Sequence, residues 1–164
     1  SPEKAKSFVQ FFGNVFWCAH TLTANRAGGT AILIRKTTGI RMVEPALCAD
    51  GRFALADCVT GNELIRLISV YAPSTATERR VFLTELRSLL ETPAALIVGG
   101  DFNCVINARD RVRGSTAPRA DAGANTLRDA VRDFDIVDVT EVLGSFSPRF
   151  IRWQGASQAR LDRV

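Results

Sequence analysis

The chain has 164 residues and a net charge of +4, with 46% of its residues hydrophobic and 23% charged. These values are typical of one globular domain with a sizeable core, and no apolar run approaches the roughly 20 residues of a membrane span. Because the first residues are polar and no signal peptide follows, we expect an intracellular protein, nuclear or cytoplasmic, that is neither secreted nor in a membrane.

The arginines, cysteines and histidine of the sequence limit which kinds of binding or catalytic site the chain can form. Arginine outnumbers lysine by 18 to 3, and its planar guanidinium suits phosphate groups, although a coding bias toward arginine is the alternative. The four cysteines are widely spaced, without a Cys-x-x-Cys pair, which argues against zinc and disulfide frameworks and favours reduced thiols. The single histidine, His20, has no nucleophile motif beside it, and we expect an ordinary loop residue.

The amino-terminal half predicts a series of strands. The first 23 residues are rich in aromatic side chains but show no clean period, whereas residues 30–35 predict a buried strand. A meander follows, and its third strand is apolar on both faces, which predicts a central position before Pro73 ends it. The meander strands are predicted at residues 42–48, 52–59 and 63–71, with a type I′ turn at Asp50-Gly51 and another turn at residues 60–62.

A helix is predicted over residues 74–91. Thr75 and Glu78 have the spacing of a capping box, and Pro93 follows the last turn. The apolar side chains recur at the spacing of one helix face, and they are Phe82, Leu83, Leu86, Leu89 and Leu90.

The next apolar run, residues 95–98, ends in two glycines followed by Asp101 and Asn103. Its four consecutive apolar residues predict a strand buried on both faces. If the strand geometry continues, Asp101 and Asn103 point the same way and Phe102 points into the core. Polar groups at the carboxyl end of a buried strand are typical of sites in α/β sheets, while a simple polar turn is the alternative.

The carboxyl-terminal third begins with a long polar loop rich in arginine. Asp121 is expected to cap a helix that runs to about Phe134, with its apolar residues inward. Short strands are predicted at residues 136–139, 150–153 and 159–164. Strands and helices in this order predict a layered α/β domain. The loop arginines are Arg109, Arg111, Arg113 and Arg119.

Polar side chains stand at three predicted strand ends, namely Tyr71, Asp101 with Asn103, and Asp162. Such a set suits attack of water on a phosphodiester. An aspartate can orient or deprotonate the water, and an amide can hold a phosphate oxygen. The tyrosine hydroxyl can donate to the phosphate, and the second aspartate can orient a histidine or bind a metal. A divalent metal normally assists this chemistry.

Three short motifs occur in register along the chain: Val-Tyr-Ala-Pro at residues 70–73, Gly-Gly-Asp-Phe-Asn at 99–103 and Ala-Arg-Leu-Asp-Arg-Val at 159–164. Together they resemble the endonuclease/exonuclease/phosphatase superfamily. This resemblance implies an α/β fold arranged as a four-layer α/β/β/α sandwich, which agrees with the predicted strands and helices.

Three further segments, at residues 27–33, 121–124 and 152–157, are most similar to the apurinic-type endonuclease domain of LINE-like non-LTR retrotransposons. The resemblance implies metal-dependent hydrolysis of phosphodiester bonds, as in a DNA-nicking endonuclease. It also implies Mg²⁺ as cofactor, DNA as partner, and a reverse transcriptase domain in the same parent polyprotein. Residues 1–164 are then expected to form a single partial domain, incomplete at both ends.

The resemblance gives a role to each matching position. Asp101 matches the aspartate that orients or activates the nucleophilic water, and Asn103 matches the asparagine that helps to bind the scissile phosphate. Tyr71 matches the active-site tyrosine, and Asp162 matches the aspartate that pairs with a carboxyl-terminal histidine. We expect the arginine loop to face the phosphate backbone, with Arg109, Arg111 and Arg113 as substrate-binding residues.

The chain also departs from the family pattern. The Gln-Glu pair that supplies the metal-binding glutamate does not precede Arg26, and the chain stops at Val164 before a Ser-Asp-His motif. Ser74 and Ile151 stand where asparagine and threonine are usual. No metal ligand is therefore assigned, and we expect the chain alone to show little or no nuclease activity. Two alternatives stay open: a non-catalytic remnant that at most binds nucleic acid, and a phosphatase acting on phosphoesters or phosphoinositides.

Overall fold

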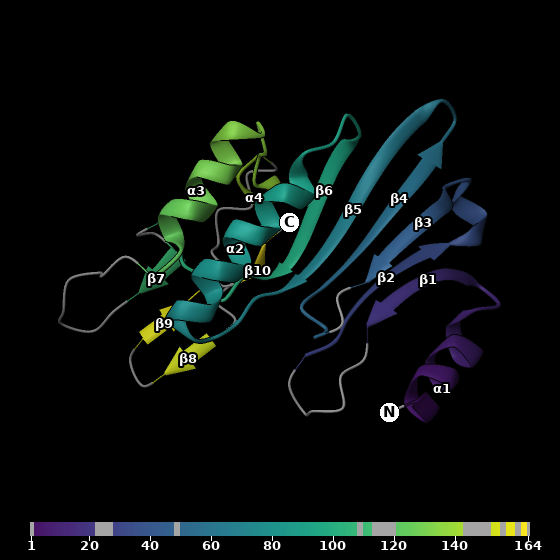
Figure 1. Cartoon of the computed structure of the whole chain (residues 1–164), viewed down its shortest axis with the longest axis horizontal. Coiled ribbons are helices and arrows are strands. Elements are labelled where there is room, and N and C mark those ends of the chain that lie inside the picture. Colours follow the sequence, from purple (N-terminus) through teal and green to yellow (C-terminus); the bar gives the residue numbers. More distant parts are fainter. Residues whose placement is uncertain are drawn as a thin grey trace. The chain divides into compact units, whose positions relative to one another are not determined.

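The computed structural model divides into two compact units. Unit 1 comprises Ser1–Tyr71 and Thr92–Gly99, and unit 2 comprises Ala72–Glu91 and Gly100–Val164. Strands and helices occur in both units, so the predicted α/β class is confirmed (Figure 1). That the whole chain forms a single domain stays a prediction. The structure describes residues 2–21, 28–47, 50–107, 110–112, 121–142, 152–154, 157–159 and 162–163.

The main sheet of unit 1 contains the predicted meander. Strands β3 (Arg41–Leu47), β4 (Phe53–Thr60) and β5 (Glu63–Tyr71) are antiparallel neighbours. Strand β6 (Ala95–Asp101) lies on the other side of β5. Because β5 has a neighbour on each side, its predicted central position is confirmed.

A second sheet of unit 1 consists of two antiparallel strands, β1 (Phe16–Thr21) and β2 (Thr30–Arg35). Buried and exposed side chains alternate along β2, which confirms the predicted strand. The two sheets of this unit face each other, because one buried cluster takes side chains from β1, β2 and β4. The cluster consists of Ala19, Ile32, Ile34, Ala54, Ala56 and Cys58, with Ile40, Met42 and Leu67 packed against it.

The aromatic amino-terminal stretch forms a helix and a strand, which its sequence pattern does not reveal. Helix α1 (Pro2–Phe12) carries Phe8 and Phe12 one turn apart, with 4.9 Å between the ring centroids. The Phe8 centroid also lies 4.9 Å from that of His20. His20 belongs to β1, so the expectation of a loop residue is wrong. Aromatic contacts between the helix and the strand favour both elements, and periodicity within one segment cannot detect them.

The two turns of the meander differ. Between β4 and β5, Thr60 pairs with Glu63 and the chain turns at Gly61 and Asn62, which confirms the turn predicted at residues 60–62. At Asp50-Gly51 the predicted type I′ turn is wrong, since that type needs positive φ at both residues. Gly51 has a φ of 72°, whereas Asp50 is not among the described non-glycine residues with positive φ. The Asp50 carboxylate instead accepts a hydrogen bond from the Arg52 N–H at 3.1 Å.

Strand β6 is less buried than its sequence predicts. Its residues are exposed or half-buried, and Ile97 is 49% exposed. The strand itself is confirmed, but the prediction of burial on both faces is wrong. Four consecutive apolar residues indicate a strand without deciding what covers each of its faces.

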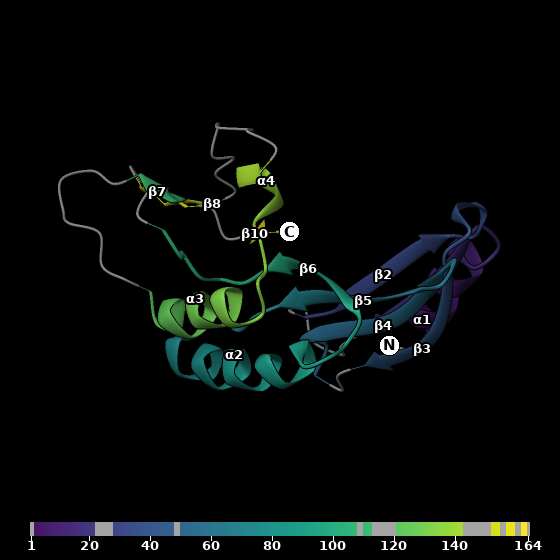
Figure 2. The ribbon, with the colours of Figure 1, turned by 90° about the horizontal axis from the view of Figure 1, so that it is seen from above.

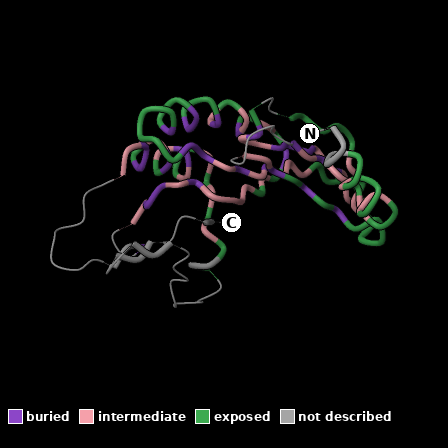
Figure 3. Tube along the Cα trace, turned by 90° about the horizontal axis from the view of Figure 1, so that it is seen from below, coloured by how far each residue is buried: buried purple, intermediate pink, exposed green. Residues whose placement is uncertain are grey.

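Helices α2 (Ala76–Leu90) and α3 (Ala124–Asp133) lie side by side in unit 2 (Figure 1, Figure 2). Each helix buries one face and exposes the other, as Figure 3 shows. The ion pair between Arg87 and Asp133 joins them, with 2.7 Å between Nη2 and Oδ2. Most residues of the predicted apolar stripes are buried, namely Phe82, Leu83, Leu86 and Leu90 in α2 and Leu127 and Ala130 in α3, whereas Leu89 is half-buried. Arg79 of α2 and Ala124 of α3 are also buried.

The amino ends of these helices differ from the predicted caps. The Thr75 hydroxyl donates to the Glu78 carboxylate at 2.6 Å and makes no capping bond to the helix backbone. The predicted capping box is thus a contact between two side chains. Before α3, Gly123 takes the N-cap position with a φ of 93°, so capping by Asp121 is wrong. The Asp121 carboxylate accepts the Val105 N–H instead.

The carboxyl-terminal strands lie in part within the predicted ranges, of which residues 150–151, 160–161 and 164 fall outside the described residues. Strands β7 (Arg111–Val112), β9 (Ser157–Ala159) and β8 (Arg152–Gln154) form a three-stranded antiparallel sheet. Strand β10 (Asp162–Arg163) pairs with β6. The described residues of the single strand predicted at 159–164 therefore belong to two sheets, because Ala159 pairs in one and Asp162 and Arg163 pair in the other.

The strand predicted at residues 136–139 is also wrong. Asp135 has a φ of 51°, and the Ile136 N–H donates to the Val131 carbonyl at 2.9 Å. These features close the carboxyl end of α3 as a left-handed turn. A short helix, α4 (Val139–Val142), follows.

Three cysteines are placed as expected. Among the described residues Cys18, Cys58 and Cys104 form no disulfide, Cys58 and Cys104 are buried and Cys18 is half-buried. Burial raises the pKa of Cys18 and Cys58. Cys48 lies outside the described residues. In the part of the chain that the structure describes, no helix is long and apolar enough to span a bilayer.

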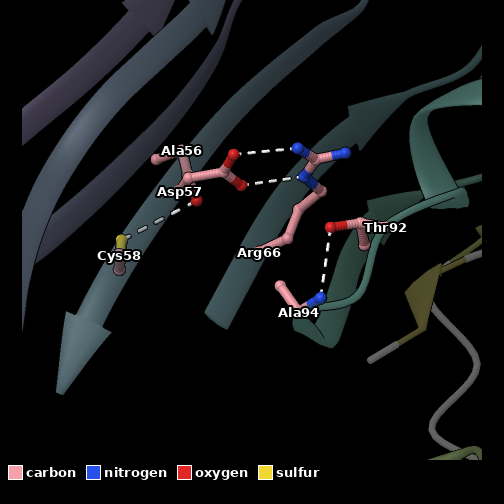
Figure 4. Close-up of polar contacts among 6 residues, drawn as sticks. All are labelled: Ala56, Asp57, Cys58, Arg66, Thr92 and Ala94. Carbon is pink, nitrogen blue, oxygen red and sulfur yellow. Dashed lines mark hydrogen bonds and ion pairs between the residues drawn. The ribbon is translucent and has the colours of Figure 1, made fainter. Parts of the chain in front are cut away.

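One ion pair of unit 1 crosses the β4–β5 ladder (Figure 4). Arg66 donates from Nε and Nη2 to the two carboxylate oxygens of Asp57, both at 2.8 Å. The side chains are 20% and 26% exposed, so water screens the pair only in part. The hydrogen bond from Arg66 lowers the pKa of the Asp57 carboxyl below its ordinary value.

Candidate functional site

The end of β6 brings two of the predicted catalytic positions together. Gly100 and Asp101 pair in antiparallel register with Arg163 and Asp162 of β10. Asp162 is thus the backbone partner of Asp101, and both belong to unit 2. Directly opposed residues of an antiparallel pair have Cα atoms about 4.5–5.5 Å apart, so the two positions share one local site.

Asp101 also fixes the residues that follow it. Its Oδ1 accepts a hydrogen bond from the Asn103 N–H at 2.8 Å, a bond typical of aspartate in turns. Asn103 has a φ of 47°, a left-handed conformation that asparagine tolerates better than most residues. The strand therefore ends at Asp101, and the prediction that its geometry continues to Asn103 is wrong. Phe102 is 4% exposed, which confirms its predicted core position.

A neighbouring segment of unit 2 holds the Asn103 side chain. Its Nδ2 donates to the Ala72 carbonyl at 2.8 Å, and the Ala72 N–H donates to the Asp101 carbonyl at the same distance. With the bond between Asp101 and Asn103, these contacts close a ring of three hydrogen bonds, here called the site ring. Ala72 is fully buried, so water does not compete for its backbone groups. Asp101 and Asn103 thus come together by a route other than strand alternation.

Two further aspartates support the loop after Asn103, and both were missed as site residues. The Asp121 Oδ2 accepts the Val105 N–H at 3.0 Å. Asp110 is 1% exposed, and its Oδ2 accepts the Asn107 N–H at 3.1 Å. Both carboxylates accept hydrogen bonds from backbone N–H groups in a segment that has no strand partner to accept them. The sequence carries only a weak signal for this, since aspartates in polar loops often make such bonds.

Tyr71 is the last residue of β5 and belongs to unit 1. Its N–H donates to the Arg52 carbonyl at 2.8 Å. The Arg52 guanidinium carbon lies 5.4 Å from the centroid of the tyrosine ring, which is a cation–π distance. The structure thus places a positive charge beside this ring. Sequence reasoning missed Arg52, because only the strand register brings it to Tyr71.

Two of the three arginines that were predicted to bind substrate, Arg109 and Arg113, lie outside the described residues. Arg111 is the first residue of β7, where its Cα partner is Ala159, so this part of the predicted loop is a strand. A role of these arginines in binding DNA stays a prediction.

Asp101 is the described carboxylate at the end of β6 that could take part in holding Mg²⁺. Mg²⁺ is usually held by one or two carboxylates together with water and substrate phosphates. Asp101 offers a carboxylate, but its Oδ1 already accepts the Asn103 N–H. Within the described ranges, no group of three or more His, Cys, Asp or Glu side chains gathers to hold a metal ion. Mg²⁺ therefore stays an expectation.

The chain is similar to known proteins over nearly its whole length. The sequence model of the Endonuclease/Exonuclease/phosphatase family matches residues 4–164. The Transposon TX1 uncharacterized 149 kDa protein of Xenopus laevis is 36% identical over 172 residues, covering 100% of this chain. The chain spans 13% of the length of that relative.

Solved structures share the fold. The crystal structure of D. rerio TDP2 complexed with single strand DNA product gives a TM-score of 0.58 at 16% identity, covering 98% of this chain and 65% of that chain. Truncated Caenorhabditis elegans TDP2 gives a TM-score of 0.58 at 17% identity, covering 96% of this chain and 63% of that chain. At these identities the likeness concerns the fold, and it confirms the fold class expected from the resemblance.

Proposed function

The chain belongs to the endonuclease/exonuclease/phosphatase family, and we propose that it is the DNA-nicking endonuclease domain of a non-LTR retrotransposon. Members of this superfamily are generally hydrolases that act on phosphodiester bonds. Similarity to a transposon protein supports the retroelement origin. The proposed reaction is attack of water on a DNA phosphodiester, assisted by Mg²⁺ when it is bound.

The observation that carries this proposal is the site ring at the end of β6. Its hydrogen bonds fix Asp101 and Asn103 on defined backbone, and preorganised groups stabilise a transition state better than mobile ones. Asn103 also adopts a φ of 47°. Non-glycine residues held in this region are concentrated at functional sites.

Asp101 orients the attacking water or takes its proton. One of its carboxylate oxygens is bound to the Asn103 N–H at 2.8 Å, which restricts the rotation of the carboxylate. The second oxygen then keeps a defined direction. A carboxylate held in this way acts as a general base when that oxygen reaches the water.

Asn103 binds the scissile phosphate. A carboxamide has two N–H donors, and Asn103 uses one of them on the Ala72 carbonyl. The second N–H is the donor that we assign to a phosphate oxygen. A fixed donor at this position stabilises the charge that develops on the phosphate in the transition state.

The remaining assignments rest on the resemblance. Tyr71 donates to the phosphate or supports the water, and the positive charge of Arg52 beside its ring favours an anionic substrate. Asp162 orients a histidine. The phosphate backbone of DNA is contacted by Arg109, Arg111 and Arg113, and a reverse transcriptase in the same polyprotein is the proposed partner.

Nicking of a supercoiled plasmid tests this function. The protein assayed is the product of the full reading frame that encodes this chain, with Mg²⁺ present or removed by EDTA. We expect Mg²⁺-dependent nicks that Asp101→Ala abolishes. Glu85→Ala, which removes a carboxylate from an exposed position of α2, is the matched control and should nick as the wild type does.

The other outcomes separate the alternatives. Nicking that survives Asp101→Ala contradicts the assigned site. DNA binding that Asn103→Asp weakens, in the absence of any nicking, identifies a non-catalytic remnant. Hydrolysis of a phosphoinositide in preference to DNA identifies the phosphatase alternative.

A further inference from the structure

We infer that Arg79 is a positioning residue for this site, because it holds the backbone segments that the Asn103 loop contacts. Arg79 is 7% exposed, although its guanidinium is always charged. A buried charge requires hydrogen-bond partners, and the partners of Arg79 show what the charge does. The inference rests on the proposed role of Asn103 and extends the site beyond the sequence motifs.

Arg79 holds the segment that precedes α2. Its Nη1 donates to the carbonyls of Pro73 at 3.3 Å and Ser74 at 2.8 Å. These residues directly follow Ala72, whose carbonyl accepts the Asn103 side chain. A movement of Pro73 and Ser74 would therefore displace the acceptor that orients the Asn103 carboxamide.

Arg79 also holds the segment that precedes α3. Its Nε donates to the Ala122 carbonyl at 2.9 Å. The residue before Ala122 is Asp121, whose Oδ2 accepts the Val105 N–H at 3.0 Å. Val105 lies two residues after Asn103, so this second connection reaches the other side of the same loop.

Gly123 shows how closely the segment before α3 packs on α2. A Cβ at this position would lie 2.7 Å from Leu83 Cδ1 and 3.8 Å from Arg79 Cγ. The φ of Gly123 is 93°, which also favours glycine. The segment is therefore pressed against the same helix that carries Arg79.

One guanidinium thus joins two segments, at residues 72–74 and 121–123, and the Asn103 loop is hydrogen-bonded to both. Arginine suits this task because its planar group presents donors in several fixed directions. Removing it would leave three carbonyls short of a donor and free the segments to move separately.

Amide hydrogen exchange of the 164-residue chain, followed by NMR without DNA, tests the inference. The variant is Arg79→Met, and the matched control is Arg80→Met at the next, exposed position. In Arg79→Met we expect about tenfold faster exchange at the N–H groups of Ala72, Asn103 and Val105. Exchange in the β4–β5 ladder of unit 1 should not change, and Arg80→Met should match the wild type throughout.

Unchanged exchange at these three N–H groups would overturn the inference. An equal acceleration in the β4–β5 ladder would also overturn it, since this indicates a general loss of stability. If Arg79→Met does not fold, Arg79→Lys is measured instead. A single ammonium group cannot donate to both segments as the guanidinium does. We therefore expect faster exchange at the same N–H groups than in the wild type, but a smaller change than in Arg79→Met, together with shifted Asn103 carboxamide resonances. Wild-type values in Arg79→Lys would contradict the inference.

This experiment separates the two claims because it contains no DNA. Faster exchange in Arg79→Met together with failure of the plasmid assay would leave the positioning contacts intact and reject the nuclease function. Plasmid nicking with unchanged exchange would reject only the role of Arg79.

Discussion

Arg66 in unit 1 and Arg79 in unit 2 are two largely buried arginines with different partners. Arg66 binds the carboxylate of Asp57 on the neighbouring strand through two bonds of 2.8 Å. Arg79 donates to the backbone carbonyls of three residues in two segments. Arg66 joins two strands whose backbone groups are already hydrogen-bonded to each other. Arg79, in contrast, binds backbone carbonyls in segments that are not part of a strand pair.

The difference shows how the candidate site is built. In the β4–β5 ladder of unit 1, strand pairing satisfies the backbone, and the ion pair of Asp57 and Arg66 adds to it. At the end of β6 the chain leaves regular structure, and side chains satisfy the backbone instead, as those of Asp101, Asn103 and Asp121 do. Irregular backbone can hold a functional group in place only when such bonds make it rigid.

The largest effect is expected from Asp101→Asn in the plasmid assay of the full reading frame. The asparagine oxygen still accepts the Asn103 N–H, so the site ring persists, but the charge that takes the proton is lost. Plasmid nicking should fall about 10²–10⁴-fold, the usual contribution of a general base. Urea unfolding of the 164-residue chain should change little. A loss of stability that accounts for the loss of nicking would contradict the catalytic role.

Gly123→Ala tests the close packing that unit 2 needs. Its Cβ would lie 2.7 Å from Leu83 Cδ1, and the free energy of unfolding should fall by about 2–4 kcal/mol from overpacking and backbone strain together. Gly39→Ala is the matched control, because Gly39 has a φ of 76° but no atom within 4 Å of its Cβ position. It should cost only about 1 kcal/mol, for the strained φ alone. Equal costs in a urea titration would show that packing against Leu83 contributes nothing.

Asp57→Asn tests the ion pair of unit 1. We expect a loss of about 1–2 kcal/mol in the free energy of unfolding near neutral pH. The pKa of Asp57 is lowered in the folded state from its ordinary value of 3.8. The pair therefore contributes fully above that value and loses its contribution as the pH falls through the folded pKa. The stability gap between wild type and Asp57→Asn should shrink in acid, and a gap that does not change with pH would contradict the pairing.

The smallest effect is expected from Thr75→Ala at the start of α2. Since the Thr75 hydroxyl binds the Glu78 side chain and no backbone N–H, the loss should be about 0.5 kcal/mol or less, below the usual cost of an N-cap. Thermal unfolding of the two proteins measures it. A loss of the size typical for a threonine cap would show that the hydroxyl does cap the helix in solution.

The regular structure could be predicted where one pattern determined one element. Strand β5 and helix α2 are such cases, because β5 is apolar on both faces between two turns and the apolar residues of α2 follow one helix face. The strand predicted at residues 136–139 failed because the left-handed Asp135 closes α3 just before it. Helix α1 and the place of His20 depend on aromatic contacts between elements, which no local pattern contains.

The sequence predicted the residues of the site but not the hydrogen bonds that hold them in place. Asp101 and Asn103 stand out from their position after an apolar run, but the carbonyl that orients Asn103 comes from Ala72, far away in the sequence. A signal for Arg79 did exist. It lies three and four residues before Phe82 and Leu83, on the apolar stripe of α2, and a charge on such a stripe indicates a buried polar contact.

The most direct test concerns the Asn103 carboxamide. NMR of the 164-residue chain follows its two N–H protons while a short DNA duplex is added. We predict that one proton shifts strongly as it meets a phosphate oxygen, that the proton bound to the Ala72 carbonyl shifts little, and that Asn103→Asp weakens DNA binding. Binding of DNA that moves neither proton, and that Asn103→Asp leaves unchanged, would contradict the claim that the end of β6 is the phosphodiester site.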